Sequence, residues 1–110
     1  MANSQTSSNF YEYATVNVAP PAAGYASEAV DTRALRKLSV ERIFFSIRGS
    51  GQATVTLQFK CPGDSGWTDY ADYNSSTRKL IHAGAADMEW RAIVKSGAYV
   101  SGEVTFGLDW

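Results

Sequence analysis

Apolar and polar residues alternate through much of the second half of the chain. From Ala53 to Cys61 every second residue is apolar, and the positions between them hold Thr54, Thr56, Gln58 and Lys60. Successive side chains of a β-strand point to opposite faces, so this pattern predicts a strand with one buried face and one wet face. We expect both threonines to lie on the wet face.

The same period of two returns along the chain, and aromatic or β-branched segments add further expected strands. The segments are 10–18, 43–48, 67–73, 78–83, 88–95 and 103–110. Turn signals rich in Gly, Pro and Ser separate several of them, at 49–51, 62–66 and 96–97. Short strands with turns between them predict an all-β fold: a single antiparallel β-sandwich of about seven strands, immunoglobulin-like or jelly-roll-like.

The first third of the chain is less regular. Residues 1–9 are small and polar, which predicts a flexible N-terminal arm ahead of a β-sandwich domain spanning 10–110. Pro20 and Pro21 end the first strand, because proline has no backbone N–H to donate to a sheet. Residues 22–37 suit either a short helix or a loop, and both interpretations stay open.

Composition narrows the class of protein. The chain has 110 residues, of which 45% are hydrophobic and 19% charged, and its formal net charge is -1. This hydrophobic content is too high for a disordered chain, and the charge argues against a protein that coats nucleic acid. No apolar run reaches the roughly 20 residues of a transmembrane helix, and the start lacks a signal-peptide pattern. We therefore expect no nucleic-acid partner and no membrane contact.

Few side chains are available for nucleophilic catalysis or metal binding. His82 and Cys61 are the only histidine and the only cysteine of the chain. Cys61 falls on the apolar face of its predicted strand, where a buried thiol is ordinary and inert. We expect no catalytic residue, no metal and no cofactor, and therefore no enzyme.

Acidic residues offer the main alternative to that expectation. Asp64, Asp69 and Asp72 lie close together, but their spacing does not match a calcium-binding loop. We interpret them as solvated carboxylates of turns and strand edges. An enzyme would require a carboxylate pair in a cleft, for instance Asp69 with Glu89 or Asp87.

A cluster of basic residues is the one local charge asymmetry. Arg33, Arg36 and Lys37 fall within a segment in which Glu41 is the only acidic residue before Arg48. They form either a solvated face or a patch that meets an acidic partner surface. We treat them as candidate partner-binding residues.

Aromatic residues supply the other candidate contacts. Trp67, Tyr70 and Tyr73 recur at every third position, which fits neither a regular strand nor a long helix. They form either an exposed rim that stacks on sugars or packs a partner, or a bent strand that closes one end of the core. The aromatic residues that follow the arm are also candidate partner contacts: Phe10, Tyr11 and Tyr13.

The second half of the chain resembles small virion structural proteins of tailed bacteriophages. The residues that carry the resemblance are VTLQFKCPGDSGWTDYADYN, from Val55, and MEWRAIVKSGAYVSGEVTFGLDW, from Met88 to Trp110. The resemblance covers about half of the chain and includes no catalytic signature. It implies a non-enzymatic component of a phage particle.

The resemblance implies two alternative roles. The first is a capsid decoration (cement) subunit that binds and stabilises the outer shell. It would be a small homo-oligomer (dimer or trimer), and its partner would be the major capsid protein or another virion protein. The second is a tail-associated module that binds carbohydrate or a receptor. In either case the protein would be made in the bacterial host cytoplasm and reside in the virion.

The alternation itself predicts the effect of core substitutions. Leu57→Ala and Phe106→Ala should each lower the free energy of unfolding by roughly 2–5 kcal/mol, because each leaves a cavity. Thr54→Ala and Thr56→Ala, on the expected wet face, should cost much less. Urea unfolding of the four variants measures the difference, and equal losses in both sets would show that the faces are assigned wrongly.

Overall fold

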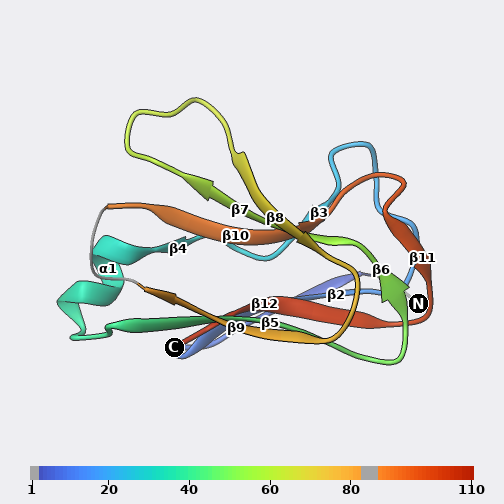
Figure 1. Ribbon diagram of the computed structural model, residues 1–110, viewed down its shortest axis with the longest axis horizontal. Coiled ribbons are helices and arrows are strands. Elements are labelled where there is room, and N and C mark those ends of the chain that lie inside the picture. Colours follow the sequence, from blue (N-terminus) through green and yellow to red (C-terminus); the bar gives the residue numbers. More distant parts are fainter. Residues whose placement is uncertain (1–2, 83–86) are drawn as a thin grey trace.

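The computed structural model describes residues 3–82 and 87–110, and two five-stranded antiparallel sheets make up most of this part of the chain. In Figure 1 the two sheets lie one above the other. The first sheet has the order β1 (Ser4–Ser7), β2 (Tyr11–Val16), β12 (Val104–Asp109), β5 (Arg42–Arg48) and β9 (Thr77–His82). The second has the order β3 (Tyr25–Ala26), β10 (Glu89–Val94), β7 (Val55–Lys60) and β8 (Thr68–Tyr73), with β4 (Val30–Asp31) also paired to β10.

Smaller elements occupy the two ends of the sandwich. Helix α1 (Thr32–Lys37) lies at one end, and the short pair β6 (Gln52–Ala53) and β11 (Tyr99–Ser101) lies at the other (Figure 1). The helix and the two strands before it fill the segment 22–37, which the sequence pattern left open between a helix and a loop.

The predicted all-β sandwich is confirmed, and the strand order distinguishes between its two forms. The chain passes back and forth between the two sheets. β2, β5, β9 and β12 belong to the first sheet, and the strands between them, β3, β4, β7, β8 and β10, belong to the second. Strands that are distant in sequence are therefore neighbours, as in a jelly roll. In an immunoglobulin-like sandwich the last two strands, F and G, are neighbours in one sheet, whereas the last two long strands here, β10 and β12, belong to different sheets.

The inward faces of the two sheets form the core. Phe45, Leu57 and Phe106 are 0%, 1% and 0% exposed, and Phe106 pairs with Ile47 in the register of β12 with β5. These positions belong to the apolar sets of their alternating segments. The buried face predicted from the sequence is therefore the face that packs between the sheets.

The opposite face of β7 differs from the expectation. Thr56 and Gln58 point outward, yet they are only 3% and 6% exposed. The Thr56 hydroxyl donates to Asp72 at 2.7 Å, and the Gln58 amide donates to Asp69 at 2.9 Å, so neighbouring side chains cover both. The expectation of a wet Thr56 is wrong, and Thr56→Ala should cost about 1 kcal/mol through the lost hydrogen bond.

The segment predicted to be a flexible arm contains strand β1. Ser4–Ser7 pairs antiparallel with β2, from Ser4 opposite Thr15 to Ser7 opposite Glu12. The Gln5 amide also donates to the carbonyl of Ala26 at 2.6 Å. This segment is polar because β1 is an exposed edge strand, and an edge strand needs no apolar face when its backbone pairs on one side.

Gly107 permits the close approach of β2 to β12. Its φ is +154°, and a Cβ added there would meet the carbonyl oxygen of Glu12 and lie 2.7 Å from Cδ1 of Tyr13. Because both contacts belong to the neighbouring strand, any larger residue must push β2 away from β12.

We expect Gly107→Ala to lower the free energy of unfolding by about 1–3 kcal/mol, the usual cost of overpacking. Gly66→Ala is the matched control, because a Cβ at Gly66 meets nothing within 4 Å. Urea unfolding of both variants measures the effect, and a Gly107→Ala protein as stable as the wild type would contradict this account of the strand pair.

Candidate functional site

Helix α1 is held at the end of the sandwich by its cap and by two buried side chains, Thr32 and Leu35. The carboxylate of Asp31 accepts a hydrogen bond from the backbone N–H of Arg33 at 2.9 Å, which is a regular N-cap. Leu35 is 4% exposed and anchors the helix to the core. Arg33, Ala34 and Lys37 of this short helix are exposed, and Arg36 is half-buried.

Next to α1 lies an apolar hollow of about 770 Å³ that we call the end groove. Its apolar lining comes from both ends of the described chain and from α1: Phe10, Ala34, Leu35, Leu38, Val40 and Trp110. Phe10 and Leu38 are 66% and 69% exposed, which is unusual for large apolar side chains. Phe10 is held in place because its carbonyl accepts from the backbone N–H of Trp110 at 2.9 Å.

The basic candidates border this groove. Arg33, Arg36 and Lys37 line an adjoining hollow together with Leu38, which also lines the end groove. Arg33 forms an ion pair with Asp31 at 3.1 Å, and this hydrogen-bonded partner holds the pKa of the Asp31 carboxyl below its ordinary value. Arg36 forms an ion pair with Asp87.

The structure thus brings Phe10 and the basic candidates to one end of the molecule. Lys37 has no ion pair within residues 3–82 and 87–110, so it adds a positive charge to the rim of the groove. The sequence signalled the charges and the aromatic residue separately. It did not signal that they meet, because Phe10 and Leu38 are distant in the chain.

Tyr11 and Tyr13 lie elsewhere, on the outer face of the first sheet. Their rings stack with centroids 5.0 Å apart, and the Arg48 guanidinium lies 4.6 Å from the centroid of the Tyr13 ring. The Tyr13 hydroxyl hydrogen-bonds to Asp109. Burial and this bond to Asp109 raise the pKa of the Tyr13 phenol. These tyrosines are therefore engaged by their own sheet.

A β-bulge explains why the aromatic residues of β8 recur at every third position. Gln58 pairs with Asp69 and Leu57 pairs with Ala71, so Tyr70 is an extra residue on β8. Trp67 stays on the outer face, where the Arg91 guanidinium lies 4.4 Å from its ring centroid. The structure therefore separates Trp67 from Tyr70 and Tyr73, and the three do not form one rim.

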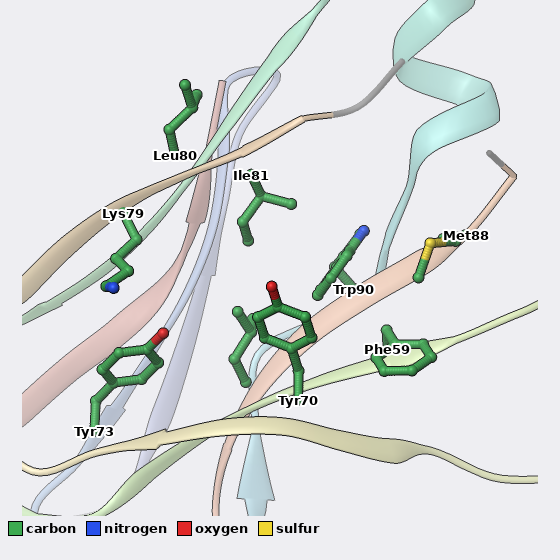
Figure 2. Close-up of a pocket in the computed structure, with 9 residues that line it drawn as sticks. Phe59, Tyr70, Tyr73, Lys79, Leu80, Ile81, Met88 and Trp90 are labelled. Carbon is green, nitrogen blue, oxygen red and sulfur yellow. The ribbon is translucent and has the colours of Figure 1, made fainter. Parts of the chain in front are cut away.

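Tyr70 and Tyr73 border a hollow of about 520 Å³ between the edge strands β8 and β9, which we call the inter-sheet cleft. Its lining is Leu57, Phe59, Tyr70, Tyr73, Lys79, Leu80, Ile81, Met88 and Trp90. Figure 2 shows that these side chains come from both sheets. Lys79 and Ile81 of β9 point toward Tyr73, Tyr70 and Trp90, whereas Leu80 points away from them. The sequence pattern placed Phe59 and Trp90 among core positions, so it contained no signal for a cleft.

Each of the acidic candidates, Asp64, Asp69 and Asp72, bonds to a partner of its own. The Asp64 carboxylate accepts from the backbone N–H of Cys61 at 3.0 Å, and Asp72 accepts from Thr56. Asp69 forms an ion pair with Lys95, and this bond holds the pKa of Asp69 below its ordinary value. In the described ranges no cluster of three or more His, Cys, Asp or Glu side chains is placed to hold a metal ion.

Cys61, His82 and the possibility of a membrane-spanning helix remain to be described. Cys61 is half-buried and forms no disulfide, while the side chain of His82 lies outside the described structure. No helix among the described residues has the length and hydrophobicity needed to cross a bilayer.

No protein-family model matches the chain, and a comparison with curated proteins found no match. The binding surfaces must therefore be judged on their own chemistry.

Asp109 is a partly buried carboxylate on the outer face of the first sheet. Its side chain is 18% exposed, and the two terminal nitrogens of the Arg78 guanidinium, Nη1 and Nη2, each donate to it at 3.0 Å. Burial alone would raise the pKa of Asp109, but the hydrogen bonds from Arg78 and Tyr13 outweigh burial and lower it. A lowered folded-state pKa stabilises the fold above the unfolded-state value of about 3.9.

We expect Asp109→Asn to lower the free energy of unfolding at neutral pH. The difference from the wild type should shrink as the pH falls below about 4, because protonation of Asp109 removes the same contribution from the wild type. Urea unfolding between about pH 7 and pH 3 tests this expectation. Glu28→Gln removes one negative charge at an exposed position and is the control, and a loss of the same size at every pH would contradict the linkage.

Proposed function

We propose that this chain is a non-enzymatic structural protein of a tailed-bacteriophage particle, a decoration or cement subunit that binds the outer shell of the capsid. The observation that carries the proposal is the end groove, an exposed apolar surface with basic side chains at its rim. Exposed apolar patches rimmed by polar residues mark protein interaction sites. The phage class itself comes from the resemblance of residues 55–110.

The chemistry of the groove favours a protein partner with apolar and acidic side chains. Phe10 and Leu38 offer apolar area that is buried only when a partner covers it, at about 25 cal/mol for each Å². Lys37 lies beside that area, where its charge can orient an acidic partner. The two arginines of α1 are already paired with the aspartates that line the same hollow. A virion protein that presents acidic residues around an apolar side chain would fit this surface.

Repetition would strengthen such a contact. A capsid presents the same site many times, and a homo-oligomeric subunit can occupy several sites at once. Weak single contacts then become durable without a large interface. Many weak contacts acting together suit a small domain whose exposed apolar groove is formed by a few side chains.

We expect Phe10→Asp and Leu38→Asp each to lower the number of copies on purified phage particles by about tenfold, because each places a charge in an apolar contact. Val100→Asp is the matched control: Val100 is 64% exposed and lies on β11, at the opposite end of the sandwich (Figure 1). Quantitative mass spectrometry of particles counts the copies, and circular dichroism of the isolated variants checks that they fold.

Electron cryo-microscopy of the same particles then locates the subunit. Density for the chain on the outer capsid shell, oriented with α1 toward the shell, is the expected result. Absence of the chain from particles would overturn the virion role. Normal copy number in both variants would instead overturn the assignment of the end groove as the docking surface.

A further inference from the structure

The inter-sheet cleft has a polar end and an apolar end. At one end, the Lys79 Nζ atom lies 5.5 Å from the centroid of the Tyr73 ring. At the other end, Phe59 and Met88 are the lining side chains, as Figure 2 shows. Trp90 packs against both Phe59 and Tyr70: its ring centroid lies 5.7 Å from that of Phe59 and 5.4 Å from that of Tyr70.

The bulge on β8 builds one wall of this cleft. Because Tyr70 is the extra residue of the bulge, its ring leans inward against Trp90 and Phe59 at interplanar angles of 78°. Tyr70 nevertheless remains 62% exposed. An aromatic wall that is half in contact and half open can therefore cover a bound molecule without rearrangement of the core.

Lys79 points toward the space between the sheets. It is opposite Phe45 in the register of β5 with β9, and Phe45 belongs to the buried core. Within residues 3–82 and 87–110, Lys79 forms no ion pair. An inward lysine on an edge strand discourages pairing with other sheets, but that role does not require an apolar cleft behind the ammonium group.

The polar groups of the cleft are suited to a ligand that accepts hydrogen bonds. Lys79 only donates, and the hydroxyls of Tyr70 and Tyr73 can donate. Among the described residues that line the cleft there is no carboxylate or amide side chain, so the many hydroxyls of a sugar would find few partners there. A single carboxylate, in contrast, would be satisfied by one ammonium and one phenol.

We propose that the inter-sheet cleft binds an amphipathic carboxylate, a molecule with one carboxylate and an apolar body of about ten carbons. The volume of the cleft lies within the range of small-molecule pockets. The carboxylate binds Lys79 and Tyr73, and the apolar body lies along Tyr70 and Trp90 toward Phe59 and Met88. This function is separate from capsid docking, because the cleft is lined by β7, β8, β9 and β10 rather than by α1.

Decanoate, at concentrations well below micelle formation, is the probe. Isothermal titration of the full chain should show saturable binding at one site, and amide and indole NMR signals should shift at Lys79, Tyr70 and Trp90. Decanol has the same apolar body without the charge and should bind more weakly. Glucose and galactose, which carry hydroxyls but no apolar chain, should produce no shift at these residues.

Two variants assign the binding to this site. Lys79→Met should weaken decanoate binding about fivefold and leave decanol binding unchanged, because the substitution removes one half-exposed ion pair. Tyr70→Ala should weaken both ligands about tenfold, because it removes an aromatic wall. Lys60→Met makes the same change at a lysine of β7 that lies beside Trp67 and lines neither hollow, and it should leave both affinities unchanged.

Each contrary result overturns the proposal. No saturable decanoate binding to the wild type would do so, as would equal weakening by Lys79→Met and Lys60→Met, or sugar-induced shifts without a decanoate response. Thermal unfolding by circular dichroism confirms that each variant is folded. Both tested positions are exposed, so folding is expected to survive.

Discussion

Apolar contact between the inward faces of the two sheets is the interaction on which the rest of the structure depends. The core side chains Phe45, Leu57 and Phe106 all lie in this layer. Both candidate surfaces, the end groove and the inter-sheet cleft, lie at edges of this apolar layer. The end groove is formed where the sandwich stops beside α1, and the inter-sheet cleft is formed where β8 and β9 leave the layer uncovered.

The outer faces are organised differently, by polar side chains that bond across neighbouring strands. On the second sheet, Arg91 donates to Gln58 at 2.8 Å and Gln58 donates to Asp69, which pairs with Lys95. On the first sheet, Arg78 and Tyr13 both bond to Asp109. Such cross-strand pairs stabilise a sheet face without an apolar cover. They also occupy Tyr13, which the sequence had offered as a partner contact.

Alternation in the sequence predicted the strands that have one apolar face, such as β7 and β12. It could not predict β1, because both faces of that strand are polar and only the pairing with β2 identifies it. It could not place Tyr70, because one extra residue in a strand reverses the direction of every side chain beyond it. The choice of a jelly roll over an immunoglobulin-like order depends on which distant strands pair, and local pattern carries no such information.

The candidate sites divide in the same way. The basic side chains of α1 and the aromatic residues were visible as residue types, and each was a reasonable candidate contact. Their assembly was not visible, because the end groove needs Phe10, Leu38 and Trp110 together and the cleft needs Lys79 beside Tyr73. A sequence lists the chemical groups, whereas long-range pairing decides which groups share a surface.

The position of β12 determines when this protein can fold during synthesis. β12 lies between β2 and β5, so those two strands share a sheet only through a strand that comes much later in the sequence. Until the ribosome has made β12, both of its neighbours carry an unpaired edge and an uncovered apolar face. Pairing across so much of the sequence is also slow. Before β12 is made, the nascent chain therefore exposes strand edges and apolar faces of the kind from which aggregation starts.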